Sequence, residues 1–336
     1  MSQQTRSRRE FLELALASAT LAEQVVAQTT SASATGMPMR PLGKTGANVS
    51  LLGLGGHHIA RPKEESEGIR LIHAAIDEGI TFMDNAWEYH QGRSEEIMGK
   101  ALAMDGRREK AFLMTKVCDR DYEGAKRHLE ESLRRLRTDR IDLWQFHECN
   151  YDNDPEFLVE KGGFRAAIEA KKEGKVRFVG FTGHKAPRIH LKMLAQKFDW
   201  DACQMPNNIM DAGFMSFREE VMPVCLRNKV GIVGMKGCCG DARVIADGHV
   251  TVEECYRYFL SQPVSVQVVG LASMEHLKEA VRIARNLKPM ADQEKTTILS
   301  RLREIVGDGR YELFKSSKAY DSAHHRWQHG FEVRGV

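Results

Sequence analysis

Short apolar runs alternate with longer amphipathic segments along most of the chain. Each run is rich in Val, Ile, Leu or Phe, which is typical of strands buried in a parallel sheet. The runs lie at 49–54, 80–83, 111–114, 141–146, 176–181, 201–204, 230–235 and 266–269. The segments between them predict helices at 64–78, 94–104, 122–137, 156–173, 186–197, 216–228, 251–261 and 274–285.

Strands and helices that alternate eight times over about 240 residues have the size and order of a closed (β/α)8 barrel, the TIM barrel. A shorter apolar pair around Leu42 and Val49, with Gly43-Lys44-Thr45-Gly46 between them, predicts a hairpin across the bottom of the barrel. Residues 37–290 therefore form the hairpin and barrel, and 291–336 form a C-terminal helix and tail.

A doubly wound sheet with a second domain is the competing architecture. Its dinucleotide fingerprint, GxGxxG, should follow the first strand. The segment Gly53-Leu54-Gly55-Gly56-His57-His58 supplies two of the glycines but has His58 in place of the third. The sequence also contains no GxxxxGK[ST] phosphate-binding loop. The barrel is the better prediction.

Residues 1–36 differ from the rest of the chain. Ser7-Arg8-Arg9-Glu10-Phe11-Leu12 matches a twin-arginine export signal, and a mildly apolar stretch and small residues that a peptidase could cut follow it. Glu13 and Glu23 interrupt the apolar stretch, so an amphipathic N-terminal helix is the alternative. We expect 1–36 to be a signal and linker, read by the twin-arginine export machinery. The protein is then periplasmic or secreted, or cytoplasmic if the signal is not used.

Composition excludes several classes of partner. The net charge of +3 is too small to predict a nucleic-acid partner, and no apolar run approaches the length of about 18 residues that a membrane span needs. The seven cysteines show no CxxC and no regular spacing, which is unlike a disulfide framework or a zinc site. Cys238-Cys239 is the one close pair; a vicinal disulfide there is the alternative to two buried thiols.

Polar residues follow three successive predicted strands. Asp84, Lys116 and His147 are spaced 32 and 31 residues apart, one βα unit each, and Tyr89 comes five residues after Asp84. A barrel brings the carboxyl ends of its strands to one mouth, where such folds place their chemistry. We therefore expect these four side chains to meet.

Together the four suit the reduction of a carbonyl group. A tyrosine hydroxyl can protonate the developing oxyanion if a neighbouring cation lowers its pKa from about 10, and Lys116 is that cation. Asp84 would hold Lys116 charged, and His147 would donate to the carbonyl oxygen. Taken singly, Asp84 and Lys116 are better explained as a structural salt bridge, and His147 as a core histidine. Their matched positions on adjacent strands favour the functional interpretation.

Over residues 40–285 the chain resembles the aldo-keto reductases. The matching segments are Leu42-Gly43-Lys44-Thr45-Gly46, Leu52-Gly53-Leu54-Gly55, Phe82-Met83-Asp84-Asn85-Ala86 with Tyr89, Thr115-Lys116, Leu133-Arg134-Arg135-Leu136 and Asp142-Leu143-Trp144-Gln145-Phe146-His147. The resemblance implies that Tyr89 is the proton donor, that Lys116 and Asp84 tune it, and that His147 orients the substrate. It also implies a small aldehyde, ketone or alcohol as the substrate.

The resemblance further implies a nicotinamide dinucleotide across the barrel mouth. The residues expected to contact it are Gly55, Thr182, Gln204, Met235, Lys236, Ser273 and Glu279. Two positions depart from the family pattern. Thr182-Gly183 replaces the usual Ser-Asn pair, and His276 stands where an arginine commonly grips the 2′-phosphate. NADP(H) is favoured by the resemblance, and NAD(H) is the competitor.

Loops and tail complete the predicted pocket. His57, His58 and Trp87 should line it, residues 237–250 should cover the cofactor, and the tail with its histidines should form a wall. No metal is expected there, because no carboxylate or thiol stands at ligand spacing from those histidines. Two other functions stay open: a nucleotide-binding redox sensor or regulatory barrel with little turnover, and an aldolase-like barrel with Lys116 as a Schiff-base nucleophile.

Overall fold

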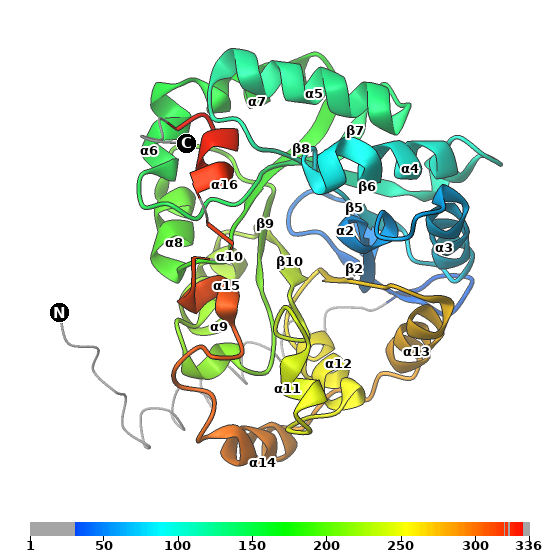
Figure 1. The fold of residues 1–336 in the computed structure, drawn as a ribbon, viewed down its shortest axis with the longest axis vertical. Helices are drawn as coiled ribbons and strands as arrows, with labels where there is room; N and C mark the ends of the chain where they lie inside the picture. The colour runs from blue at the N-terminus through cyan, green and yellow to red at the C-terminus, as the bar shows by residue number, and fades with distance from the viewer. Residues whose placement is uncertain (1–30, 319, 322, 332–336) are drawn as a thin grey trace.

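Parallel strands close into a barrel with helices packed around it (Figure 1). The computed structural model describes residues 31–318, 320–321 and 323–331. The barrel strands follow one another in chain order: β4 (Leu52–Gly55), β5 (Phe82–Asp84), β6 (Phe112–Val117), β7 (Ile141–Phe146), β8 (Val176–Thr182), β9 (Ala202–Pro206), β10 (Gly231–Met235) and β11 (Val266–Val269). β11 pairs with β4 and closes the barrel. The predicted (β/α)8 barrel is confirmed, and an open doubly wound sheet is excluded.

The helices between the strands lie where the amphipathic segments predict them, apart from two short ones at 56–59 and 243–246 that the pattern does not predict. They are α2 (Gly56–Ile59), α3 (Glu65–Asp77), α4 (Arg93–Leu102), α5 (Tyr122–Leu136), α6 (Asp154–Glu160), α7 (Gly163–Lys172), α8 (Pro187–Ala195), α9 (Phe217–Glu220), α10 (Met222–Arg227), α11 (Arg243–Ala246), α12 (Val252–Leu260) and α13 (Met274–Arg285). Two predicted helices are each divided in two. Gly162, with φ of 89°, separates α6 from α7, and Pro223 near the start of α10 cannot continue α9 because it has no N–H.

A small antiparallel sheet closes the bottom of the barrel. It consists of β1 (Ser31–Ala32), β2 (Pro38–Pro41) and β3 (Asn48–Ser50). The turn after β2 lies against the start of β10, where the Lys44 N–H donates to the Lys229 carbonyl. Leu42 and Val49 are fully buried in the cluster that fills the barrel interior. The predicted hairpin is confirmed. The twin-arginine motif lies outside the described residues.

A C-terminal extension follows the barrel. It contains α14 (Asp292–Leu302), α15 (Leu313–Ser316) and α16 (Ala323–Gln328), and α16 lies near α6 (Figure 1). Buried Lys315 fastens α15, because its ammonium pairs with Asp211 at 2.7 Å and with Glu312 at 2.9 Å. Beyond α16, Phe331 stacks on Phe157 with ring centroids 4.3 Å apart. The tail is thus packed against the barrel's outer layer.

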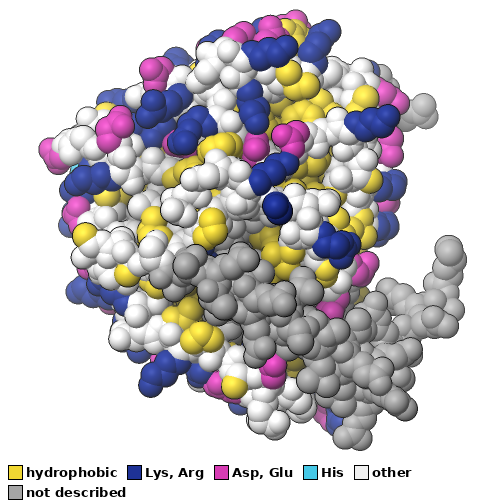
Figure 2. Space-filling view, turned by 180° about the vertical axis from the view of Figure 1, so that it is seen from behind, with side chains coloured by type: hydrophobic (Ala, Val, Ile, Leu, Met, Phe, Trp, Pro, Cys, Tyr) yellow, Lys and Arg dark blue, Asp and Glu magenta, His cyan; other side chains and the backbone are white. Residues whose placement is uncertain are grey.

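The surface mixes charges of both signs. On the face in Figure 2, Lys and Arg side chains are interspersed with Asp and Glu.

All seven cysteines are free thiols, so Cys238 and Cys239 form no vicinal disulfide. Among the described helices, none combines the length and apolar character that crossing a membrane requires.

Candidate active site

The carboxyl ends of β5 and β6 bring two opposite charges together inside the barrel mouth. The Lys116 ammonium donates to Asp84 Oδ1 at 2.8 Å and to the Asn85 carbonyl at 2.7 Å, and both charged side chains are almost fully buried. The Tyr89 hydroxyl lies 3.4 Å from Lys116 Nζ. Three of the four residues that the spacing predicts to meet therefore do so through direct contacts.

His147 completes the group from the end of β7. Its ring lies edge-on to the Tyr89 ring, with centroids 5.5 Å apart, and its Nδ1 is 2.8 Å from Glu88 Oε1. Burial raises the pKa of Glu88, but contact with His147 outweighs burial and leaves that pKa well below its usual value. Glu88 is therefore ionised and orients the imidazole through Nδ1.

The direction of the pKa shift of Tyr89 differs from the expectation. The sequence analysis expects Lys116 to lower the pKa of the phenol. In the structure, burial and the charges of Asp84 and Glu88 raise the pKa of Tyr89 well above 10. Burial is the largest cause, because it disfavours the charged phenolate, and the neighbouring carboxylates add to it. Without cofactor or substrate, Tyr89 holds its proton.

A buried arginine fixes the loops that carry these residues. Arg120 has no exposed surface, pairs with Asp154 at 2.9 Å, and donates to the carbonyls of Cys118 and His147 at 2.5 and 2.6 Å. These bonds tie the loops after β6 and β7 together. Removing one partner of such a buried ion pair costs about 3–5 kcal/mol. Backbone strain gathers in the same loops: His90, next to Tyr89, has φ of 50°, and Glu148, next to His147, has φ of 48°.

The residues expected to hold a nicotinamide face the same mouth. Gln204, on β9, donates from Nε2 to Asp84 Oδ2 at 2.9 Å, while its Oε1 is buried without a hydrogen bond from the described residues. Such an unpartnered acceptor suits the N–H₂ of a carboxamide. Thr182 ends β8 and is paired in register with Gln204. These two positions fit the nicotinamide end of the cofactor.

The structure explains why Gly183 replaces the family's asparagine. A Cβ at this position would lie 2.5 Å from the Cys149 carbonyl oxygen and 2.8 Å from the His190 ring. The loop after β8 packs so closely on the loop after β7 that no side chain fits. Backbone packing therefore excludes an asparagine side chain at position 183.

Three further predicted cofactor positions lie at the strand ends. Gly55 ends β4, in register with Asp84, and a Cβ there would meet the Val269 carbonyl at 3.0 Å. Met235 ends β10 and is half-buried. Lys236 follows with φ of 56°, and its ammonium lies over the rings of Phe314 and Tyr320 at 5.4 and 4.9 Å. Among the described residues, no carboxylate pairs with Lys236 within 4 Å.

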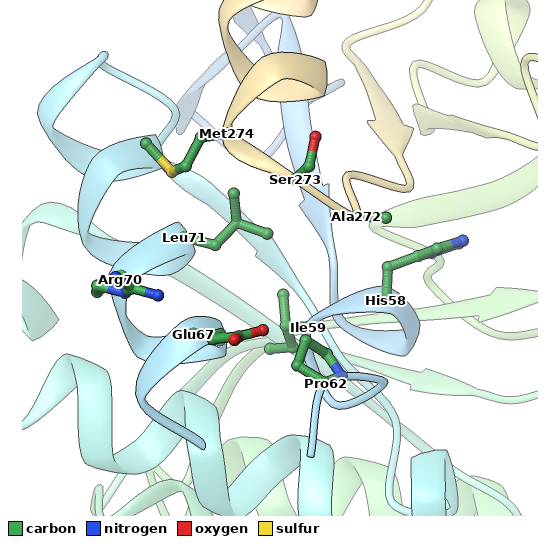
Figure 3. A pocket seen from close by; sticks show the side chains of 10 residues that line it. His58, Ile59, Pro62, Glu67, Arg70, Leu71, Ala272, Ser273 and Met274 are labelled. Carbon is green, nitrogen blue, oxygen red and sulfur yellow. The ribbon is translucent and has the colours of Figure 1, made fainter. Parts of the chain in front are cut away.

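A cavity of about 410 Å³ lies beside the first turn of α13, between that turn and α2 and α3 (Figure 3). Ser273 and Met274 line it from α13, and Glu67 and Arg70 line it from α3. Two histidines link this cavity to the mouth. His58 lines the cavity, and the ring of His57 contacts the rings of His58 and Tyr89, with centroids 5.5 and 5.3 Å apart. Ser273 caps α13 by accepting from the His276 N–H.

Two further residues of α13 that the resemblance places near the cofactor lie away from this cavity. His276 and Glu279 are exposed on α13 and do not line this cavity. Trp87 also differs from the expectation. Its ring stacks on His128 of α5, with centroids 3.6 Å apart, and its Nε1 donates to Glu131, so it packs against the outer helix instead of lining the pocket.

Three residues near the mouth were not predicted from the sequence, and a fourth, His329, was expected only as part of a wall formed by the tail. Glu88 and Glu148 flank His147, Cys118 lies 3.1 Å from Glu88 through its thiol, and His329 reaches the same place from the tail. Glu148 also contacts His184 at 3.0 Å. Glu88 and Glu148 adjoin Tyr89 and His147 in the chain, and that adjacency was the available signal.

A barrel whose mouth joins a tyrosine, a lysine, an aspartate and a histidine has the form of an oxidoreductase of the TIM-barrel class. Residues 51–237 match the sequence model of the aldo/keto reductase family. The chain is 30% identical to the aldo-keto reductase YhdN of Bacillus subtilis over 235 residues, which span 65% of this chain and 66% of YhdN. The chain belongs to the aldo/keto reductase family, whose members are NAD(P)-dependent oxidoreductases.

Solved structures share the fold. Aldo-keto reductase AKR11C1 from Bacillus halodurans superposes with a TM-score of 0.69 at 24% identity, covering 82% of this chain and 99% of that one. An aldo/keto reductase from Klebsiella pneumoniae, solved with NADP and acetate, gives a TM-score of 0.64 at 22% identity, covering 78% and 94%.

Restoring the family's asparagine should damage the site. We expect Gly183→Asn to lower the free energy of unfolding by about 1–3 kcal/mol, the usual cost of overpacking, and to leave nucleotide affinity no tighter. Urea denaturation followed by circular dichroism measures the first effect. Gly307→Asn is the control, because no atom lies within 4 Å of a Cβ there. Equal stability of the two variants would contradict the packing explanation.

Proposed function

We propose that the protein reduces small aldehydes or ketones to alcohols with NAD(P)H, and that Tyr89 is the proton donor. The observation that carries the proposal is the chain of contacts from Asp84 through Lys116 to the Tyr89 hydroxyl, at 2.8 and 3.4 Å, beside His147. A neutral phenol with an ammonium next to it is a general acid whose conjugate base is stabilised in advance.

Each residue then has a defined task. When bound, the reduced nicotinamide supplies a hydride to the carbonyl carbon. The π electrons of the carbonyl move onto oxygen, and that oxygen takes the proton of Tyr89. Lys116 stabilises the phenolate until solvent returns a proton. Glu88 lies 2.8 Å from Nδ1 of His147 and holds the ring so that an Nε2–H can donate to the same oxygen.

Two other functions have less support. The Lys116 amine is held by Asp84 and by the Asn85 carbonyl, whereas a Schiff-base nucleophile needs its amine free to attack a carbonyl. The substitutions at Gly183 and His276 remove two cofactor contacts, which would suit a nucleotide-binding sensor. The buried Gln204 Oε1 and the nearby Lys116 and Tyr89 favour turnover over sensing.

The favoured cofactor is NADP(H), with NAD(H) as the competitor. Support for NADP(H) comes from the family pattern and from the Klebsiella pneumoniae relative solved with NADP. Support for NAD(H) comes from the cavity at α13, where the carboxylate of Glu67 faces the space beside Ile59 (Figure 3) and would repel a 2′-phosphate. Arg70 on the same helix offers the opposing charge.

Tyr89→Phe should abolish carbonyl reduction and leave nucleotide affinity nearly unchanged, because it removes the transferred proton and no cofactor contact. We expect turnover to fall by about 100-fold or more, the usual contribution of a general acid. The assay follows nucleotide absorbance over a panel of aldehydes and ketones. Tyr122→Phe, whose hydroxyl contacts Glu169 on α7, is the matched control. Reduction at the parent rate by Tyr89→Phe would refute the assignment, and nucleotide binding by the parent without any turnover would support the sensor.

The dissociation constant of NADPH should be smaller than that of NADH, as quenching of tryptophan fluorescence will measure. Glu67→Gln should tighten NADPH and leave NADH nearly unchanged, because it removes a negative charge near the 2′-phosphate. Glu123→Gln on α5 is the control. Tighter binding of NADH by the parent protein would reverse the cofactor assignment.

We also propose export through the twin-arginine route, on the basis of Ser7-Arg8-Arg9-Glu10-Phe11-Leu12. Replacing both arginines by lysine should abolish export of the full chain, because the pathway reads the arginine pair. Cell fractionation with immunoblotting measures the result. Equal export of the variant, or retention of the parent chain in the cytoplasm, would exclude this route.

A further inference from the structure

Three potential metal ligands converge at the edge of the mouth. Glu88 follows β5, Cys118 follows β6, and His329 follows α16 in the tail. One ligand atom from each lies within 4.8 Å of the others. Cys118 and His329 have no exposed surface, and the side chain of Glu88 is 11% exposed. The group joins three distant parts of the chain in one buried place.

The histidine lacks the partners that burial normally demands. Both ring nitrogens of His329 are buried, and neither makes a hydrogen bond within the described part of the chain. Buried polar atoms are nearly always satisfied by hydrogen bonds or by a metal. The Cys118 thiol donates to Glu88 Oε2 at 3.1 Å. An unpartnered imidazole therefore faces a thiol and a carboxylate.

Contacts of the tail with the barrel hold the His329 imidazole beside Glu88 and Cys118. Phe331 stacks on Phe157 at 4.3 Å, and the Arg326 guanidinium lies 4.5 Å from the Tyr151 ring and 4.3 Å from that of Phe331. These contacts hold the segment on both sides of His329. The inward position of the imidazole is thus set by several independent contacts.

Charge in this corner favours a cation. The two oxygens of Glu88 face different partners, Oε1 towards His147 and Oε2 towards Cys118, and Glu148 lies close to His147. The nearby positive charge of Arg120 is matched by buried Asp154. Oε2 of Glu88 and the Cys118 thiol remain to balance a divalent ion.

We propose that Glu88, Cys118 and His329 bind one divalent transition-metal ion of the zinc type. A thiolate and an imidazole select such an ion over magnesium or calcium, which prefer oxygen ligands. Three protein ligands leave a fourth position open. Binding replaces the S–H bond of Cys118 by a sulfur–metal bond, and the proton leaves to solvent.

The metal would tie the tail to the mouth. No metal is expected from the sequence, because no carboxylate or thiol stands at ligand spacing from the tail histidines; Cys118 lies 211 residues before His329. The fold brings ligand atoms of the three side chains to within 4.8 Å of one another although they are far apart in the sequence. The site shares one residue with the proposed reductase machinery, because Glu88 turns Oε1 to His147 and Oε2 to Cys118.

The test is cobalt and zinc binding by the full chain, purified without an affinity tag and freed of metal with a chelator. One equivalent of Co²⁺ should produce the ultraviolet absorption of a thiolate-to-cobalt charge transfer, and Zn²⁺ should displace it. Cys118→Ala should lose this absorption. His329→Ala should weaken Zn²⁺ binding by about 100-fold. His324→Ala, an exposed tail histidine, and Cys225→Ala should behave like the parent.

X-ray absorption at the zinc edge of the parent protein gives a second measurement that needs no variant. One sulfur and at least one imidazole in the coordination shell would support the site. Absence of stoichiometric Co²⁺ binding, a shell without sulfur, or unchanged absorption in Cys118→Ala would overturn it. None of these measurements uses turnover, so a failed reductase assay and a failed metal site are distinguishable.

Discussion

The buried ion pair between Lys116 and Asp84 is the interaction on which the site depends. Two charges taken out of water are stable only if they face one another and their remaining hydrogen-bonding atoms are satisfied. β5 and β6 are neighbours in register, so their ends place the two side chains 2.8 Å apart. The second oxygen of Asp84 accepts from Gln204 on β9. The pair therefore links strands from opposite sides of the mouth.

The same pair explains the state of the phenol. Lys116 contacts Tyr89, but its charge is matched by Asp84, and burial together with nearby carboxylates keeps the proton on the hydroxyl. A general acid must be protonated before the reaction and must have a stabilised conjugate base after it. The ammonium 3.4 Å away supplies the second condition. Glu88 and Arg120 hold His147 beside this arrangement.

Pattern alone was sufficient for most of the fold and for the centre of the site. Period and spacing predict the strands, and equal spacing of Asp84, Lys116 and His147 predicts their meeting, because each βα unit advances the chain by one strand. The glycine at 162 and the proline at 223 are residues that interrupt helices, but the continuous apolar period across them predicted unbroken helices. The position of Trp87, the close packing at Gly183 and the docking of His329 depend on tertiary contacts between distant segments. Those contacts leave no periodic trace in the sequence.

The most direct test of the central claim is a single-turnover measurement on Lys116→Met. Enzyme loaded with reduced nucleotide is mixed with excess carbonyl substrate, and oxidation of the nucleotide is followed by stopped-flow absorbance. If the ammonium supports proton donation by Tyr89, the rate of nucleotide oxidation should fall by about 100-fold or more while nucleotide affinity changes little. Oxidation at the parent rate would contradict the account, because the buried ion pair would then have only a structural role.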